Sequence, residues 1–255
     1  MITNIYHCCV FKTGSQWIRS VLEHPLVKQA SGLDCYRYES DLPKNADTRG
    51  ICDRFFDAPL PENKILSPLF LSYECFKSIP KPKDYRAFFV SRDPRDIIVS
   101  WYFSMKYSHA ANSTIDRTRN RLHDVSTEEG MLTAINVLNK TGVFKALSSW
   151  GTGYQHNKDV RLFRFEDLTG SRSAETFLDL FDYCGIPISQ AHVEKILEQL
   201  SFKQLSGRKQ GEEDVGSHYR KGVAGDWKNY FTPEVSARFS EATGGLLNTL
   251  GYEQT

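Results

Sequence analysis

Apolar runs that lead directly into helix-like segments constrain the fold of this chain most strongly. Residues 5–11 and 85–91 are strand-like runs, and a third occupies residues 159–165. Each is followed by a segment with helix signals, such as the apolar spacing of residues 17–22. Strands that alternate with helices predict a parallel sheet. We therefore expect an α/β fold with a central parallel β-sheet flanked by helices.

Helix signals continue in the carboxyl-terminal part of the chain. Residues 171–184 and 189–200 are expected to be helices, separated by a Gly-Ile-Pro stop. Thr232 and Pro233 suit the N-cap and first position of a last helix, which we expect to run toward Leu250.

Two polar stretches are expected to be flexible. Residues 207–219 contain glycine and few apolar side chains, and residues 108–129 are similarly polar. The sequence has no internal repeat, low-complexity tract or linker. We therefore expect one domain that spans residues 1–255.

The composition argues against several classes of protein. Because 32 Lys and Arg nearly cancel 31 Asp and Glu, the overall charge gives no reason to expect binding of nucleic acid or of an anionic membrane. The sequence opens without a basic and apolar leader, and it has no run of about 18 apolar residues. We expect a cytoplasmic protein without a membrane span. The six cysteines lack paired spacing and are expected to be buried, reduced thiols.

The loop after the first strand has the features of an anion site. Lys12, Thr13, Gly14, Ser15 and Gln16 lie between an apolar strand and the start of a helix. Free backbone N–H groups and the helix dipole favour an anion there, and Lys12 adds a positive charge. The loop does not match the G-x-x-x-x-G-K-[ST] pattern, however, and such loops also contain glycine where no ligand binds.

A second anion site is expected after residues 85–91. Arg92 would lie at the carboxyl edge of the sheet, where open parallel sheets bind ligands, and its guanidinium group can hold a phosphate through two hydrogen bonds. Ser100 lies about two helical turns beyond the expected N-cap Asp93, so its hydroxyl could reach the same group. The alternative is a surface cluster of salt bridges that caps the helix.

Residues 219–232 contain a third candidate. Adjacent Arg220 and Lys221 precede Gly222 and Gly225, which permit a close approach of the backbone to a ligand. These features suit a phosphate clamp on a loop. Solvated charges in an ordered turn are the alternative.

Together these segments resemble sulfotransferases that use 3′-phosphoadenosine 5′-phosphosulfate (PAPS). Lys-Thr-Gly-Ser-Gln-Trp at residues 12–17 resembles the family's 5′-phosphosulfate loop, although Gln16 replaces the usual hydroxyl residue. Residues 88–102 are similar to its 3′-phosphate motif, and residues 220–232 to its Arg-Lys-Gly-x-x-Gly-Asp-Trp-Lys-Asn-x-Phe-Thr signature. The chain is identified as a member of this family, which implies a P-loop-like phosphosulfate-binding loop in an α/β fold.

The resemblance implies roles for individual residues. Trp17 and Phe202 would lie on opposite faces of the adenine, with ordinary core packing as the alternative for both. Phe165 stands where the family has a tyrosine that contacts adenine, so the stacking on adenine is kept and the hydrogen bond of the hydroxyl is lost. The resulting nucleotide-binding residues are Lys12, Thr13, Gly14, Ser15, Gln16, Trp17, Arg92, Ser100, Phe165, Phe202, Arg220, Lys221 and Gly222.

The reaction implied by the family is in-line transfer of a sulfuryl group from PAPS to a hydroxyl or amine, with adenosine 3′,5′-bisphosphate (PAP) as product. Negative charge builds on the leaving phosphate, so a positioned cation matters most. Lys12 is the expected catalytic cation. The motifs require no metal.

The general base is the missing part of the pattern. The family commonly has a histidine in a Lys-x-His context, and here Ser67 or Pro68 lies near its place. His109 is the expected catalytic replacement. Asp53 or Glu74 are alternatives if burial raises the pKa of the carboxyl group.

Other readings of the function stay open. A nucleotide or small-molecule kinase needs a lysine after the last glycine of the loop, whereas Lys12 precedes Gly14. A catalytically inactive nucleotide-binding protein would explain the missing histidine. The acceptor is expected to be a small polar or aromatic molecule that the sequence does not identify, and a homodimer is one alternative for the oligomeric state.

Overall fold

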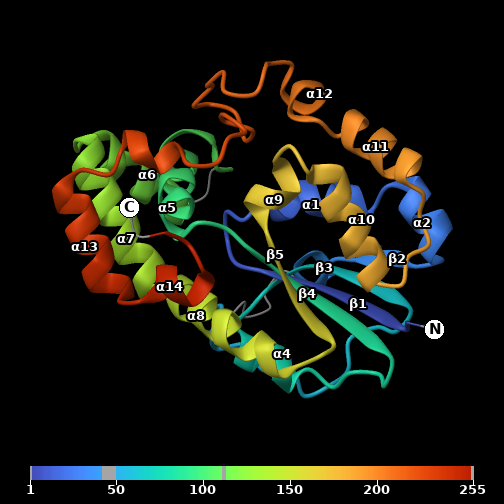
Figure 1. Ribbon diagram of the computed structural model, residues 1–255. Helices are drawn as coiled ribbons and strands as arrows, with labels where there is room; N and C mark the ends of the chain where they lie inside the picture. Colours follow the sequence, from blue (N-terminus) through green and yellow to red (C-terminus); the bar gives the residue numbers. More distant parts are fainter. Residues whose placement is uncertain (1, 42–49, 111–112, 254–255) are drawn as a thin grey trace. The chain divides into compact units, whose positions relative to one another are not determined.

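The computed structural model describes residues 2–41, 50–110 and 113–253 (Figure 1). The chain forms two compact units, which we describe separately. Unit 1 comprises Met1–Arg92 and Lys145–Leu200, and unit 2 comprises Asp93–Phe144 and Ser201–Thr255. The expectation of one domain over residues 1–255 stays a prediction.

A five-stranded parallel sheet forms the centre of unit 1, which confirms the predicted α/β class. The strands lie in the order β2-β3-β1-β4-β5. Their bounds are β1 (Asn4–Cys9), β2 (Asp34–Tyr36), β3 (Lys64–Phe70), β4 (Tyr85–Ser91) and β5 (Val160–Arg164). Every residue of β1 is buried, as expected for a central strand covered on both faces.

Helices cover both faces of this sheet (Figure 1). On one face, Ile18, Phe177 and Phe181 pack with Phe88 of β4 in the main apolar core. On the other face, Trp150 stacks on Phe89 at 4.7 Å between ring centres, and its indole N–H donates to the carbonyl of Leu71 at 2.8 Å. The elements involved are α1 (Ser15–Leu22), α2 (Pro25–Ser31), α3 (Tyr38–Asp41), α4 (Tyr73–Ser78), the unit 1 part of α8 (Val143–Gly153), η2 (Tyr154–His156), α9 (Phe165–Thr169), α10 (Ser173–Tyr183) and α11 (Gln190–Gln199).

Unit 2 is helical in the part of the chain that the structure describes. The ring of Tyr102 lies against Gly130, and Phe144 and Phe231 contact Phe239 edge-on. Its elements are α5 (Pro94–Phe103), the π-helix η1 (Ser104–Ser108), α6 (Ser113–His123), α7 (Thr127–Lys140), the start of α8, α12 (Phe202–Ser206), η3 (Asp226–Asn229), α13 (Pro233–Thr243) and α14 (Leu246–Leu250).

Two expectations about this part of the chain were wrong. Residues 108–129 contain α6 and the start of α7, whose first turn is closed by a capping box between Ser126 and Glu129. The last helix ends at Gly244, which adopts φ 56° and ψ −127°, and a separate helix follows. This backbone conformation is accessible essentially to glycine alone, so it interrupts the helix.

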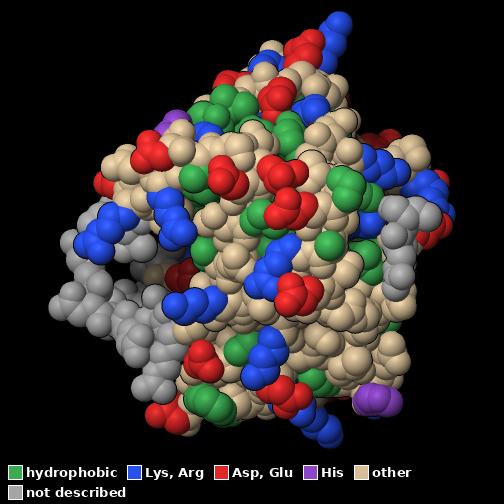
Figure 2. Space-filling view, turned by 90° about the vertical axis from the view of Figure 1, so that its left-hand side faces the viewer, with side chains coloured by type: hydrophobic (Ala, Val, Ile, Leu, Met, Phe, Trp, Pro, Cys, Tyr) green, Lys and Arg blue, Asp and Glu red, His purple; other side chains and the backbone are tan. Residues whose placement is uncertain are grey.

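The expectation of buried, reduced cysteines holds in part, because Cys35 and Cys52 are only half-buried. All six cysteines are free thiols, and four of them are buried. On the face drawn in Figure 2, acidic and basic side chains are interspersed.

In the described part of the chain, no helix combines the length and the apolar character that crossing a membrane requires.

Candidate functional site

The sheet order places the first two predicted motifs beside each other. β1 and β4 are neighbours, but the chain leaves β1 toward β2 on one side and β4 toward β5 on the other. Open α/β sheets bind ligands at such a reversal, outside the carboxyl ends of the strands. Lys12 follows β1 and Arg92 follows β4. The guanidinium Nη1 of Arg92 donates to the carbonyl oxygen of Lys12 at 3.0 Å, so the structure brings these two residues together.

The loop after β1 has a compact, left-handed backbone. Lys12 and Gly14 have φ angles of 70° and 76°, and Gly14 is the N-cap residue of α1. The hydroxyl of buried Thr13 donates to the carbonyl of Val10 at 2.9 Å, which braces the loop. Ser15 is buried in the first turn of α1. Because Gly14 has no side chain to cap the helix, the first backbone N–H groups of α1 are available to an anion.

Phe165 holds this loop against Arg92. A Cβ atom on Gly14 would lie 2.5 Å from the ring of Phe165, so only glycine permits this approach. The guanidinium carbon of Arg92 lies 4.6 Å from the centre of the same ring. Phe165 was predicted to stack on adenine. The structure shows a contact with the loop and with Arg92, and the adenine contact stays a prediction.

Lys12 has an unusual charge environment. Its side chain is half-buried, and burial together with the neighbouring Arg92 charge lowers the pKa of Lys12 to about 8. An anion bound near both cations would offset their repulsion and favour the charged lysine. The electrostatics therefore suit a ligand that carries phosphate or sulfate.

Trp17 connects the start of α1 with the end of α11. Its indole N–H donates to the carbonyl of Leu200 at 2.8 Å, and its ring meets Phe177 edge-on at 5.5 Å between centres. The residue is only half-buried. It thus packs on the core, as the alternative reading held, while part of its surface stays accessible.

In unit 2, the helix after Arg92 holds the third motif. Asp96 is buried, and its two carboxylate oxygens accept hydrogen bonds from the backbone N–H groups of Gly225 (2.7 Å) and Trp227 (3.0 Å). Buried Arg95 pairs with Asp93 at 2.8 Å and stacks on Trp227, with 3.6 Å from its guanidinium carbon to the ring centre. The alternative reading is thus right about the salt bridge and about the cap, because Asp93 also caps α5, but wrong about the surface, because these side chains are buried.

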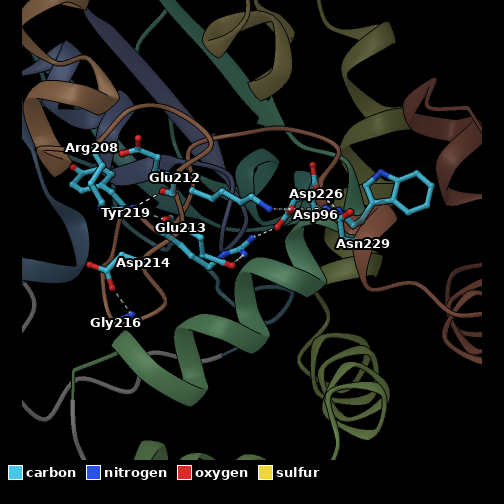
Figure 3. A network of polar contacts seen from close by, with 12 residues as sticks. Asp96, Arg208, Glu212, Glu213, Asp214, Gly216, Tyr219, Asp226 and Asn229 are labelled. Atoms are coloured by element: carbon cyan, nitrogen blue, oxygen red, sulfur yellow. Dashed lines mark hydrogen bonds and ion pairs between the residues drawn. The ribbon is translucent and has the colours of Figure 1, made fainter.

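The predicted phosphate clamp is engaged with carboxylates (Figure 3). Arg220 donates to Glu213 and to Asp226, and the ammonium of Lys221 donates to Asp226 at 2.6 Å. Burial lowers the pKa of Arg220, but its hydrogen bonds to the two carboxylates outweigh this, and the net shift is upward. Gly222 has a φ of 68°, and a Cβ there would lie 2.3 Å from the ring of Phe202. Phe202 therefore contacts the clamp, and its adenine contact stays a prediction.

The remaining site predictions are placed as follows. Ser100 is half-buried in α5, and Gln16 is half-buried in α1. His109 is exposed, and its ring Nδ1 lies 3.3 Å from the carbonyl of Ala110. Its role as a base stays a prediction.

The carboxylate alternatives lack the burial that they required. Asp53 and Glu74 are both exposed, and Glu74 pairs with Lys77 at 2.6 Å. Ser67, near the place of the family's histidine, is buried with its hydroxyl 2.7 Å from Nδ1 of His7. Burial lowers the pKa of His7 to about 3, so this imidazole is neutral.

Sequence reasoning did not identify two residues of this site as important. Asp96, in the second motif, accepts hydrogen bonds from the backbone of the third. The carboxylate of Glu213 forms an ion pair with the guanidinium of Arg220. The sequence offered one signal for Asp96: it is a second acidic residue after Asp93 inside the second motif, and a carboxylate there needs hydrogen-bond donors. Glu213 lies outside every quoted motif, so no sequence signal pointed to it.

Comparison with known proteins shows the family of this chain. A family model described as the sulfotransferase domain matches residues 8–251. The chain belongs to the sulfotransferase family. Among curated sulfotransferases, cytosolic sulfotransferase 1 of Arabidopsis thaliana is 30% identical over 176 residues, covering 63% of this chain and 50% of the relative. Cytosolic sulfotransferase 10 of the same plant is 25% identical, covering 91% of this chain and 74% of the relative. The first match thus spans only half of that sulfotransferase's length.

Solved structures show the same fold. Mouse sulfotransferase SULT7A1 complexed with PAP has a TM-score of 0.61 and 19% identity, and the match covers 96% of this chain and 83% of the other. Retinol dehydratase in complex with androsterone and PAP has a TM-score of 0.57 and 16% identity, with 96% and 80% covered.

Proposed function

We propose that this protein transfers a sulfuryl group from PAPS to a hydroxyl or amine of a small-molecule acceptor and releases PAP. One observation carries the proposal: Lys12 and Arg92 meet at the reversal point of a parallel sheet, where the ring of Phe165 lies against both Arg92 and Gly14. Membership of the sulfotransferase family and the PAP complexes of structurally similar proteins support it.

We assign the nucleotide to both sets of site residues. The loop from Lys12 to Gln16 would hold the 5′ phosphosulfate, and Arg92 with Ser100 the 3′ phosphate. Arg220, Lys221 and Gly222 would complete the 3′-phosphate site, with Trp17, Phe165 and Phe202 at the adenine. These roles follow the family motifs position by position, and the charges of the loop and clamp and the uncapped start of α1 support them.

The chemistry follows from the charge on the loop. The acceptor oxygen or nitrogen attacks sulfur, the bond from sulfur to the 5′-phosphate oxygen breaks, and that oxygen leaves with negative charge. The ammonium of Lys12 would stabilise this charge. One positioned donor of this kind lowers the activation barrier by about 3 kcal/mol. The acceptor's proton passes to a base or to solvent, and His109 is our candidate. A phenol or amine needs less help from such a base.

The acceptor and the location are proposed from the relatives. Solved retinol dehydratase structures hold androsterone or retinol beside PAP, which supports a small, largely apolar acceptor with a hydroxyl group. Relatives named cytosolic sulfotransferases support a cytoplasmic location.

Calorimetry without magnesium tests the nucleotide site. We expect the protein to bind PAP stoichiometrically and in preference to ADP. Arg92→Ala should weaken PAP binding at least about tenfold, through loss of a charge-assisted hydrogen bond. Preference for ADP with magnesium would favour a kinase instead. Tight PAP binding without sulfuryl transfer from PAPS to any phenol, alcohol or amine tested would favour the inactive alternative.

A further inference from the structure

The clamp formed by Arg220 and Lys221 is electrically neutral as the structure stands. Its two cations are paired with two carboxylates, those of Glu213 and Asp226. A phosphate dianion that approached this cluster would meet no net positive charge and would lie beside a carboxylate of like charge. One carboxylate must leave Arg220 before a phosphate can use it fully.

The two carboxylates differ in how firmly they are held. The side chain of Asp226 is only 2% exposed, and Arg220, Lys221 and the amide of Asn229 all donate to it. The side chain of Glu213 is 33% exposed, and the structure shows its contact with Arg220 alone among the described polar contacts. Asp226 is therefore a fixed part of the clamp, and Glu213 is the carboxylate that can move.

Residues 208–214 place Glu213 at the clamp. The N–H groups of Gly211 and Asp214 donate to the carbonyls of Lys221 and Arg220, each at 2.9 Å. Arg208 donates to the carbonyl of Arg220 at 2.9 Å, and to other carbonyls of this segment (Figure 3). The polar segment at residues 207–219 is thus tied along the clamp through its backbone, and Glu213 is presented to Arg220 by this pairing.

We propose that Glu213 is a specificity-determining residue, an internal anion that occupies Arg220 until the 3′ phosphate of a nucleotide replaces it. This inference rests on the proposed function. A phosphate dianion binds a guanidinium more strongly than a single carboxylate does, through two oxygens and more charge. A nucleotide with a 3′ hydroxyl cannot displace Glu213. Glu213 therefore makes the site selective for donors that carry a 3′ phosphate.

Two Glu→Gln substitutions, each of which removes one negative charge from the same loop, test the proposal. Glu213→Gln should bind PAP about fivefold more tightly than the wild type, the range of a partly exposed ion pair. Binding of 5′-AMP, which has no 3′ phosphate, should stay within about twofold for both proteins. Glu212→Gln is the control, because it removes the same charge from the same loop, where Glu212 accepts from the backbone N–H of Lys209 at 3.0 Å. Both variants are compared by calorimetry at equal salt, after thermal unfolding has shown that each is folded.

Unchanged or weaker PAP binding by Glu213→Gln would overturn the inference. Weaker binding would mean that Glu213 orients Arg220 for the nucleotide rather than competing with it. If the wild type binds no PAP at all, the proposed function fails. Binding of inorganic phosphate then tests the role of Glu213 separately from the proposed function. Tighter phosphate binding by Glu213→Gln than by Glu212→Gln supports competition between Glu213 and phosphate for Arg220, and equal binding refutes it.

Discussion

The low pKa of Lys12 gives the proposed reaction a pH dependence. Only the protonated lysine can stabilise the leaving phosphate, and its pKa in the free protein is about 8. As the pH rises above about 8, kcat/KM for PAPS should fall about tenfold per pH unit, because kcat/KM reports the free enzyme. The fall in kcat should begin at higher pH, since bound phosphosulfate favours the charged lysine. A flat profile to pH 10 in both parameters, measured by steady-state kinetics, would contradict this role.

Removal of the Lys12 charge should act mainly on the chemical step. Lys12→Met should lower kcat about 100-fold to 1,000-fold, as loss of one preorganised donor does. Lys28→Met is the control, because Lys28 is an exposed lysine that pairs with Asp34 away from the loop. Comparable losses in both variants would remove Lys12 from the mechanism.

Gly14 and Gly32 separate a steric effect from a conformational one. Both have positive φ, 76° and 70°, but Phe165 lies against Gly14 whereas nothing lies within 4 Å of a Cβ at Gly32. Each change to Ala should cost about 1 kcal/mol for the left-handed backbone. Gly14→Ala should cost about 1–3 kcal/mol more, because the ring must move. Urea unfolding measures the free energy of unfolding of each variant. Equal losses in Gly14→Ala and Gly32→Ala would show that the Phe165 ring moves aside without cost.

At the scale of the elements, Asp96 joins α5 to the turn before η3. Asp96→Asn places an amide N–H₂ group where the backbone N–H groups of Gly225 and Trp227 need acceptors. We expect a loss of about 2–3 kcal/mol in the free energy of unfolding, from one buried group left without its partner. Amide hydrogen exchange should quicken at Gly225 and Trp227 first. Unchanged exchange at both would show that other contacts hold this turn.

The elements that were predicted are those whose pattern is local. β1, β4 and β5 are short segments rich in apolar and aromatic residues, and the sequence identified all three within a few residues. β3 was missed because Ser67 and Pro68 interrupt its apolar run, and β2 because it has only three residues. Among site residues, the motifs located the loop and the clamp. The pairing of Glu213 with Arg220 depends on how residues 208–214 fold back, which short-range patterns do not encode.

At the scale of the whole molecule, the proposed nucleotide residues fall in both units. Lys12 and Arg92 belong to unit 1, whereas Ser100, Arg220 and Lys221 belong to unit 2. A ligand stabilises every part of the chain that must be folded to bind it. The distribution of these residues therefore makes unfolding of the full chain a test of the site and of the one-domain expectation together.

PAP at about 100 times its Kd should raise the free energy of unfolding by about 2.7 kcal/mol, and 5′-AMP at the same concentration by much less. If residues of both units hold the nucleotide, PAP should move every transition in the calorimetric trace to a higher temperature, whether there is one transition or two. Two transitions of which PAP moves only one would confine the nucleotide to a single unit. The residue assignments in the other unit would then be wrong, and the expectation of one domain would fail with them.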